Sequence, residues 1–182
     1  MIPGPDEVIR FWFEEIAPKQ WWAQDAAFDE ALSTRFGTAH AAAARCELYA
    51  WREQPAGRLA EILVLDQFSR NIYRDDPRSF ACDPMALCLA QEAVRIGADQ
   101  AVPAERRVFL YMPFMHSESV AIHEWAIKLF GALEMESNLQ SERRHKAIID
   151  KFGRYPHRNR ILGRTSTPEE LDFLTRKGSS FE

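Results

Sequence analysis

Arginine and asparagine occur together in two segments that lie far apart in the sequence, residues 65–74 and 152–170. The planar guanidinium group donates a fork of hydrogen bonds that matches a carboxylate or a phosphate, and the asparagine amide adds directional hydrogen bonds. Two such segments indicate either a binding site for an anion or a buried polar network. The candidate ligand-binding residues are Asp66, Arg70, Asn71, Arg154, His157, Arg158, Asn159 and Arg164.

The first segment combines an aspartate and an arginine on one face of a predicted helix. At 100° per residue, Asp66 lies in the apolar stripe formed by Leu59, Ile62 and Leu63, and Arg70 follows one turn later. A buried carboxylate needs a cationic partner, so we expect these two side chains to pair. The pair is either a structural ion pair between packed helices or a means of aiming the arginine at a ligand anion.

Histidine and glutamate supply the candidates for acid–base chemistry. His116 and Glu118 flank a predicted helix start, with Ser117 as its cap, and they would titrate apart if partly buried. They are the candidate catalytic residues. His145 lies in the apolar stripe of a later helix, where a histidine is typically a core residue bonded to a carboxylate or a carbonyl.

The same part of the chain offers a weak pattern for a metal site. The spacing matches no zinc motif such as H-E-x-x-H, and the sequence contains no phosphate-binding loop, nucleophile elbow or dinucleotide fingerprint. We therefore expect neither a metal nor a cofactor. The nitrogen and oxygen ligands considered are His116, Glu118, His123, Glu124 and His145.

The elements that position these residues are predicted to be helices throughout, because no segment alternates apolar and polar residues with period two. Helix lengths of roughly ten to eighteen residues with short connections favour an antiparallel array of helical hairpins. Helices are predicted to begin at Pro5, Asp25, Pro55, Asp83 with Pro84, Pro103 and Thr167. They are predicted to end at Gly37, Gly97, Gly153 and Gly178, and Pro113 should end or bend another. An apolar stripe is expected from Ile122, Trp125, Ala126, Leu129, Phe130 and Leu133.

Length and composition fit one all-helical domain over residues 1–182. The net charge is −4 without a basic stripe, which argues against nucleic acid as a partner, and no run approaches the ~20 apolar residues of a membrane span. Three cysteines without a secretory signal favour a reduced, cytoplasmic location. Trp21 and Trp22 cannot both face inward on a helix, so a homodimer through one of them is possible.

Five short motifs are distinctive. They are FWF (residues 11–13), LDQFSRN (65–71), PFMHSE (113–118), FGRYPHRN (152–159) and GRTSTPEE (163–170). Together they resemble the motifs of a bacterial family called domain of unknown function 924. The resemblance implies an all-α, tetratricopeptide-like fold but no activity, so it assigns no catalytic residue. Ser69 stands where the family usually has proline, and His123 where it usually has glutamine.

Three hypotheses for the function follow. The two Arg-Asn segments could meet and bind a small anionic ligand, with or without catalysis. Alternatively, the helices could form a scaffold that binds a peptide or a partner protein, as stacked hairpins often do. In the third, the polar residues only join helices to one another. The sequence leaves open whether the protein is an enzyme.

Overall fold

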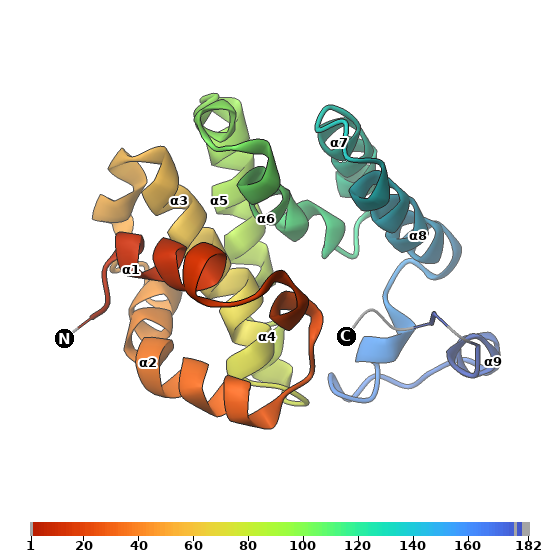
Figure 1. Cartoon of the computed structure of the whole chain (residues 1–182). Coiled ribbons are helices and arrows are strands. Elements are labelled where there is room, and N and C mark those ends of the chain that lie inside the picture. Colours follow the sequence, from red (N-terminus) through yellow and green to blue (C-terminus); the bar gives the residue numbers. More distant parts are fainter. Residues whose placement is uncertain (1, 177, 180–182) are drawn as a thin grey trace.

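The structure, a computed structural model, describes residues 2–176 and 178–179. Within these residues every regular element is helical and no strand occurs, so the all-α prediction is confirmed. The α-helices are α1 (Pro5–Arg10), α2 (Ala26–Ala44), α3 (Pro55–Leu63), α4 (Ser69–Ile72), α5 (Asp83–Arg95), α6 (Ala104–Met115), α7 (Val120–Gly131), α8 (Glu136–Phe152) and α9 (Pro168–Leu174) (Figure 1).

Several helices begin as their sequences predict. The Asp25 carboxylate accepts hydrogen bonds from the backbone N–H groups of Ala27 and Phe28 at 2.9 and 3.2 Å, which caps α2. At α9, Thr167 and Glu170 exchange side-chain and backbone hydrogen bonds in a capping box. These signals are local, and the structure agrees with them.

Two predicted caps are wrong. Asp83 is the first residue of α5, not its cap, and its carboxylate binds Arg70 instead. The residue that precedes α7 is Ser119, not Ser117, and its side chain makes no capping bond. At α5, the ion pair with Arg70 takes priority over the local capping pattern. At α7, the helix begins two residues later than that pattern predicts.

Three predicted helix ends also differ from the structure. Helix α2 continues through Gly37 to Ala44, because the alanine-rich sequence that follows strongly favours a helix. Helix α6 passes Pro113 and ends two residues later, at Met115, so Pro113 does not end it; that Pro113 bends the helix stays a prediction. Helix α9 ends at Leu174, before Gly178, while Gly97 and Gly153 have left-handed φ values of 73° and 68° as expected.

A π-helical segment, η4 (Val64–Phe68), joins α3 to α4, so the chain is helical without interruption over residues 55–72. All five residues of η4 are buried. Each π turn holds more residues than an α turn and changes which side chains face a given direction. The 100° spacing used for the sequence is therefore only approximate across Asp66 and Gln67.

Most buried apolar residues form one large cluster around the aromatic rings of Trp12, Phe36, Phe68 and Phe109. Ile148, Ile149 and Tyr155 form a second, smaller cluster towards the C-terminus. Helices α7 and α8 lie side by side, apart from the N-terminal helices (Figure 1).

The apolar stripe predicted for α7 is partly wrong. Ala126 and Phe130 are buried, but Trp125 is 56% exposed and His123 is buried instead. The face that packs against the rest of the protein is therefore rotated towards His123. Within the described residues, no helix is both long enough and apolar enough to cross a bilayer.

Candidate functional site

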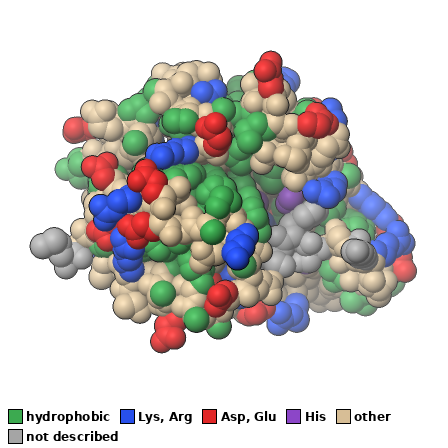
Figure 2. Space-filling view, viewed as in Figure 1, with side chains coloured by type: hydrophobic (Ala, Val, Ile, Leu, Met, Phe, Trp, Pro, Cys, Tyr) green, Lys and Arg blue, Asp and Glu red, His purple; other side chains and the backbone are tan. Residues whose placement is uncertain are grey.

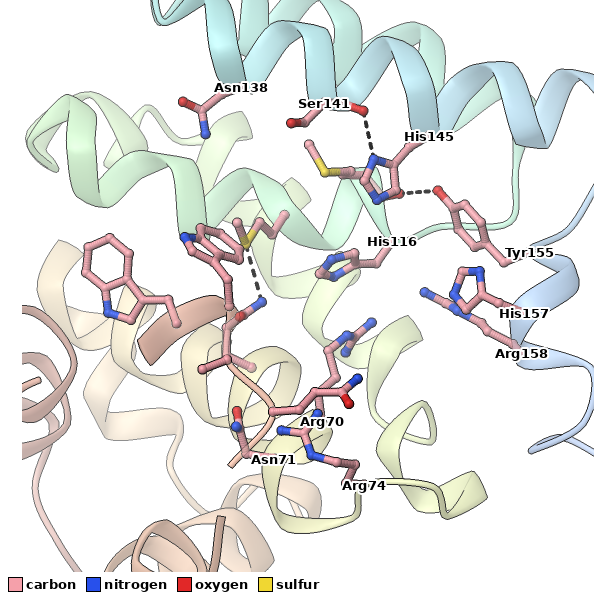
Figure 3. Close-up of a pocket in the computed structure, with 17 residues that line it drawn as sticks. Arg70, Asn71, Arg74, His116, Asn138, Ser141, His145, Tyr155, His157 and Arg158 are labelled. Atoms are coloured by element: carbon pink, nitrogen blue, oxygen red, sulfur yellow. Dashed lines mark hydrogen bonds between the residues drawn. The ribbon is translucent and has the colours of Figure 1, made fainter. Parts of the chain in front are cut away.

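A cavity of about 290 Å³ lies where segments from both ends of the chain meet. Its walls come from η2 (Pro18–Trp22), from η4 and α4, from α6 and α8, and from η7 (Pro156–Arg158). The lining residues are Trp21, Trp22, Ala23, Gln24, Gln67, Arg70, Asn71, Arg74, Met112, Met115, His116, Asn138, Ser141, His145, Tyr155, His157 and Arg158 (Figure 3).

Arginines from both Arg-Asn segments converge on this cavity. Arg70 lies on α4, Arg74 lies two residues after the end of α4, and Arg158 lies on η7 (Figure 3). His157 and Asn71 line the cavity as well. Of the candidate ligand-binding residues, Arg70, Asn71, His157 and Arg158 thus lie around one space. Arg74, the last residue of the first Arg-Asn segment, lines the same space.

The Asp83 carboxylate joins the two arginine segments. It accepts hydrogen bonds from Arg70 at 2.9 and 3.0 Å and from Arg158 at 3.2 Å. The Arg158 guanidinium also lies 4.6 Å from the ring centres of both Phe80 and Tyr155. Arg158 is only 5% exposed, so these contacts fix its position firmly.

Asp66 is fully buried and binds three neighbours. Its carboxylate lies 3.1 Å from Arg70, as the sequence predicts, and accepts a hydrogen bond from Gln67 at 2.6 Å. His116 Nδ1 is 2.7 Å from Asp66 Oδ1. Burial raises the pKa of Asp66, but Arg70 and His116 outweigh it, so the pKa of this carboxyl lies below its usual range.

His116 is therefore oriented by a carboxylate. Burial and the charge of Arg70 lower the pKa of His116, which keeps the imidazole neutral at neutral pH. Because the ionised Asp66 can only accept a hydrogen bond, the Nδ1 of His116 carries the proton and its Nε2 carries the lone pair. The ring lines the cavity (Figure 3). This tautomer suits a general base.

His145 was predicted to be a core histidine bonded to a carbonyl or a carboxylate, and this is confirmed. Its Nδ1 donates to the Ser141 carbonyl over 2.8 Å. Burial lowers the pKa of His145 to about 3. Its ring also lines the cavity, which the sequence did not reveal.

Glu118, the second catalytic candidate, is not part of the cavity lining. Its carboxylate accepts hydrogen bonds from Arg164 at 2.6 and 2.9 Å and from the backbone N–H of Tyr155 at 2.7 Å. Burial opposes ionisation of this carboxyl, but Arg164 lowers its pKa. The contacts of Glu118 hold the segment after α8 against the start of α7. His116 and Glu118 thus have different surroundings, and of the two only His116 lines the cavity.

Arg154, Asn159 and Arg164 also lie outside the described lining of the cavity, in an ion-pair cluster around Glu170 and Glu118. Arg154 donates to Glu170 at 2.7 and 2.8 Å. Asn159, which is fully buried, donates to Glu170 at 3.2 Å and accepts from Arg164 at 2.9 Å. These contacts fit the structural network that the sequence left open as an alternative.

The residues considered as metal ligands separate into different contacts. His123 Nδ1 lies 2.6 Å from Glu142 Oε1, with both side chains fully buried, and Glu124 pairs with Lys146 at 2.9 Å. Among the described residues, no three His, Cys, Asp or Glu side chains are grouped so that they could hold a metal ion.

The sequence reading missed the aromatic part of the site. Trp21 and Trp22 line the cavity, and Trp22 is 62% exposed. Two adjacent tryptophans predict that one of them is exposed. They do not predict that both line the same cavity as the arginines. In the view of Figure 2, apolar side chains gather over the middle of the molecule, with acidic and basic side chains around them.

Comparisons with known proteins show the family to which the chain belongs. A family model described as "Bacterial protein of unknown function (DUF924)" matches residues 8–178. The chain belongs to this family. A solved structure of similar fold is a protein of unknown function, ATU0120, from Agrobacterium tumefaciens, with 44% identity and a TM-score of 0.89 over 93% of this chain and 96% of that one. No curated protein matches. The family resemblance of the sequence motifs is thus confirmed.

Proposed function

We propose that the protein binds a small anionic ligand, bearing a carboxylate or a phosphate, in the cavity between the two Arg-Asn segments. The observation that carries the proposal is the composition of the lining. It contains three arginines and three histidines, and no Asp or Glu among its described residues. Arg70, Arg74 and Arg158 would donate to the anion.

The electrostatics support this assignment. Each arginine is held by a carboxylate outside the lining: Asp66 and Asp83 hold Arg70, Asp83 holds Arg158, and the third pair is Arg74 with Asp29 at 2.6 Å. An anion in the cavity would lie closer to the guanidinium groups than to these carboxylates. Because attraction falls with distance, the cations would dominate inside the cavity although the charges balance overall.

His116 adds acid–base chemistry to this proposal. Its Nε2 would accept a proton from a ligand held by the arginines, and Asp66 would stabilise the resulting imidazolium. The cavity therefore has the groups for proton transfer next to a bound anion. Binding is the primary claim, and catalysis by His116 would build on it.

The test is a binding experiment with matched arginine variants. Thermal shift and calorimetry would be run with inorganic phosphate, succinate and a nucleoside monophosphate. Arg74→Gln removes a charge from the cavity, and Arg158→Lys keeps the charge but loses the planar fork. We expect each variant to weaken binding about tenfold, the loss typical of one charge-assisted hydrogen bond.

Arg160→Gln is the control. Arg160 belongs to the second Arg-Asn segment, but its side chain is 77% exposed and pairs with Asp75 away from the cavity. It should bind every probe as the parent does. Equal weakening in Arg160→Gln and Arg74→Gln would mean that the probes respond only to net charge, and the proposal would be abandoned.

A scaffold function is the second candidate, and the helix contacts favour it. Each helix from α5 to α8 contacts the next one in the chain, which is the succession that a stacked, tetratricopeptide-like array would also give. A scaffold would capture a protein partner through an exposed face such as that of Trp125. Binding of that partner would be lost in Trp125→Ala and retained in Arg74→Gln. This is the reverse of the pattern expected for an anion bound in the cavity.

A further inference from the structure

The cavity has an aromatic part in addition to its cationic part. Trp21 and Trp22 come from η2, near the N-terminus, and Met112 and Met115 come from α6. The arginines come from α4, the turn after it, and η7. These apolar groups and the cationic groups therefore enter the cavity from different elements.

The two indole rings are held in place by the core beneath them. The Trp22 ring stacks on Phe109 with ring centres 6.1 Å apart and planes 11° from parallel. Trp21 meets the same ring edge-on at 5.0 Å and donates its Nε1–H to the Trp12 carbonyl at 2.8 Å. Both rings are thus positioned without a ligand, which lowers the entropic cost of binding against them.

Trp22 combines this fixed position with high exposure, at 62%. A large aromatic side chain so exposed at the edge of a concave site is typical of a binding surface. An aromatic ring of the ligand could stack or pack edge-on against the indoles, at a gain beyond the simple burial of its area.

We propose that the ligand is an aromatic anion, with its carboxylate or phosphate towards Arg70, Arg74 and Arg158 and its ring towards Trp21 and Trp22. This inference rests on the proposed anion-binding function and names the ligand class for that site. The cavity volume of about 290 Å³ lies at the small end of ligand sites. It suits one aromatic ring system with one anionic group.

The experiment compares probes that differ only in the ring or only in the charge. Binding is followed by calorimetry on the full chain. The pairs are acetate with indole-3-acetate and inorganic phosphate with phenyl phosphate, and indole-3-acetamide is the uncharged partner of indole-3-acetate. We expect each aromatic anion to bind at least about tenfold more tightly than its small counterpart, from burial of the ring.

The variants separate the two parts of the site. Trp22→Ala should weaken binding of indole-3-acetate about five- to tenfold and leave phosphate binding unchanged, because only the ring contact is lost. Trp125→Ala is the control, since Trp125 is similarly exposed, at 56%, but lies on α7 outside the cavity lining. It should bind all probes as the parent does.

The outcomes distinguish this inference from the proposal on which it rests. If acetate and phosphate bind, if Arg74→Gln weakens their binding about tenfold, and if an added ring gains nothing, the anion site stands and the aromatic ligand class is wrong. If indole-3-acetamide binds as tightly as indole-3-acetate, the anion site itself is wrong. If no probe binds, both are wrong.

The same chemistry occurs in a free aromatic acid and at the carboxyl end of a peptide with a terminal aromatic residue. A second arm therefore compares N-acetyl-phenylalanine with a tetrapeptide that ends in phenylalanine, and with the same tetrapeptide amidated at its end. Tighter binding of the tetrapeptide would identify the source as a peptide terminus, and equal binding would identify a free acid. Loss of binding on amidation is expected, and its absence would overturn the aromatic-anion assignment.

Discussion

At the scale of single residues, the arginines of the two Arg-Asn segments differ in which carboxylate they bind and in whether they line the cavity. Arg70 and Arg158 share Asp83 and still line the cavity, whereas Arg154 and Arg164 bind Glu170 and Glu118 outside it. Pairs within one helical turn can be predicted from spacing, as Asp66 with Arg70 was. The Asp83–Arg158 contact joins residues 75 positions apart, and no local spacing reveals such a contact.

The histidines predict how stability depends on pH. The pKa of His145 is about 3 in the folded protein, so in acid the unfolded chain binds a proton there that the folded chain does not. This contribution to stability is complete above the ordinary histidine pKa of about 6.5 and is lost as the pH falls from there towards 3. His40 and His116, whose pKa values burial also lowers, act in the same direction.

We expect the free energy of unfolding to fall below pH 6.5, with His145 contributing a slope of up to about 1.4 kcal/mol per pH unit. In His145→Gln that slope should be shallower by about this amount. Urea unfolding at pH 7, 6, 5 and 4.5 measures it. An identical pH dependence in both proteins would show that His145 is not buried in its neutral form.

At the scale of elements, the sequence predicts helix class and most capped starts but not the π turn. Pro5, Pro55 and Thr167 begin helices through local chemistry that their neighbours cannot easily override. The π-helical segment η4 depends on how the whole helix packs, since its buried residues contact several other helices. A helical wheel describes pairs within one helix, so it predicts the Asp66–Arg70 pair but not the approach of His116, which directly follows α6.

Two glycines within helices offer matched substitutions that test how closely each helix packs against its neighbours. An added Cβ at Gly57 in α3 would lie 2.0 Å from the Trp51 carbonyl oxygen, so the backbone must shift. At Gly37 in α2, the nearest atom is Ser33 Oγ at 4.0 Å. Gly57→Ala should destabilise the protein by about 3 kcal/mol or more, and Gly37→Ala should stabilise it by about 0.5–1 kcal/mol.

Chemical denaturation of the two alanine variants measures both values. Both changes add one methyl group to a helix, but opposite signs are expected because only the one at Gly57 meets a backbone carbonyl. Stabilisation by Gly57→Ala would mean that α3 does not approach Trp51 as closely as described, and would call into question the position of the helix that carries Asp66.

At the scale of the whole molecule, the site exists because segments from the two ends of the chain meet. The sequence identified the two Arg-Asn segments and the family, and these are the parts with distinctive residue types at short spacing. It did not place Trp21, Trp22, Met112 or His145 at the cavity, since their apolar patterns are those of ordinary core residues. They come together only in the folded chain, which places residues of η2, α6 and α8 around the same cavity as those of α4 and η7.

The most direct test is a crystal structure of the full chain with 4-iodobenzoate, whose iodine and carboxylate mark the two ends of an aromatic anion. Our account predicts an iodine anomalous peak beside Trp21 and Trp22, with the carboxylate within hydrogen-bond distance of Arg70, Arg74 or Arg158. Iodine peaks only at surface sites, with the cavity unchanged at saturating probe, would contradict it. The arginines would then belong to the architecture of the fold alone.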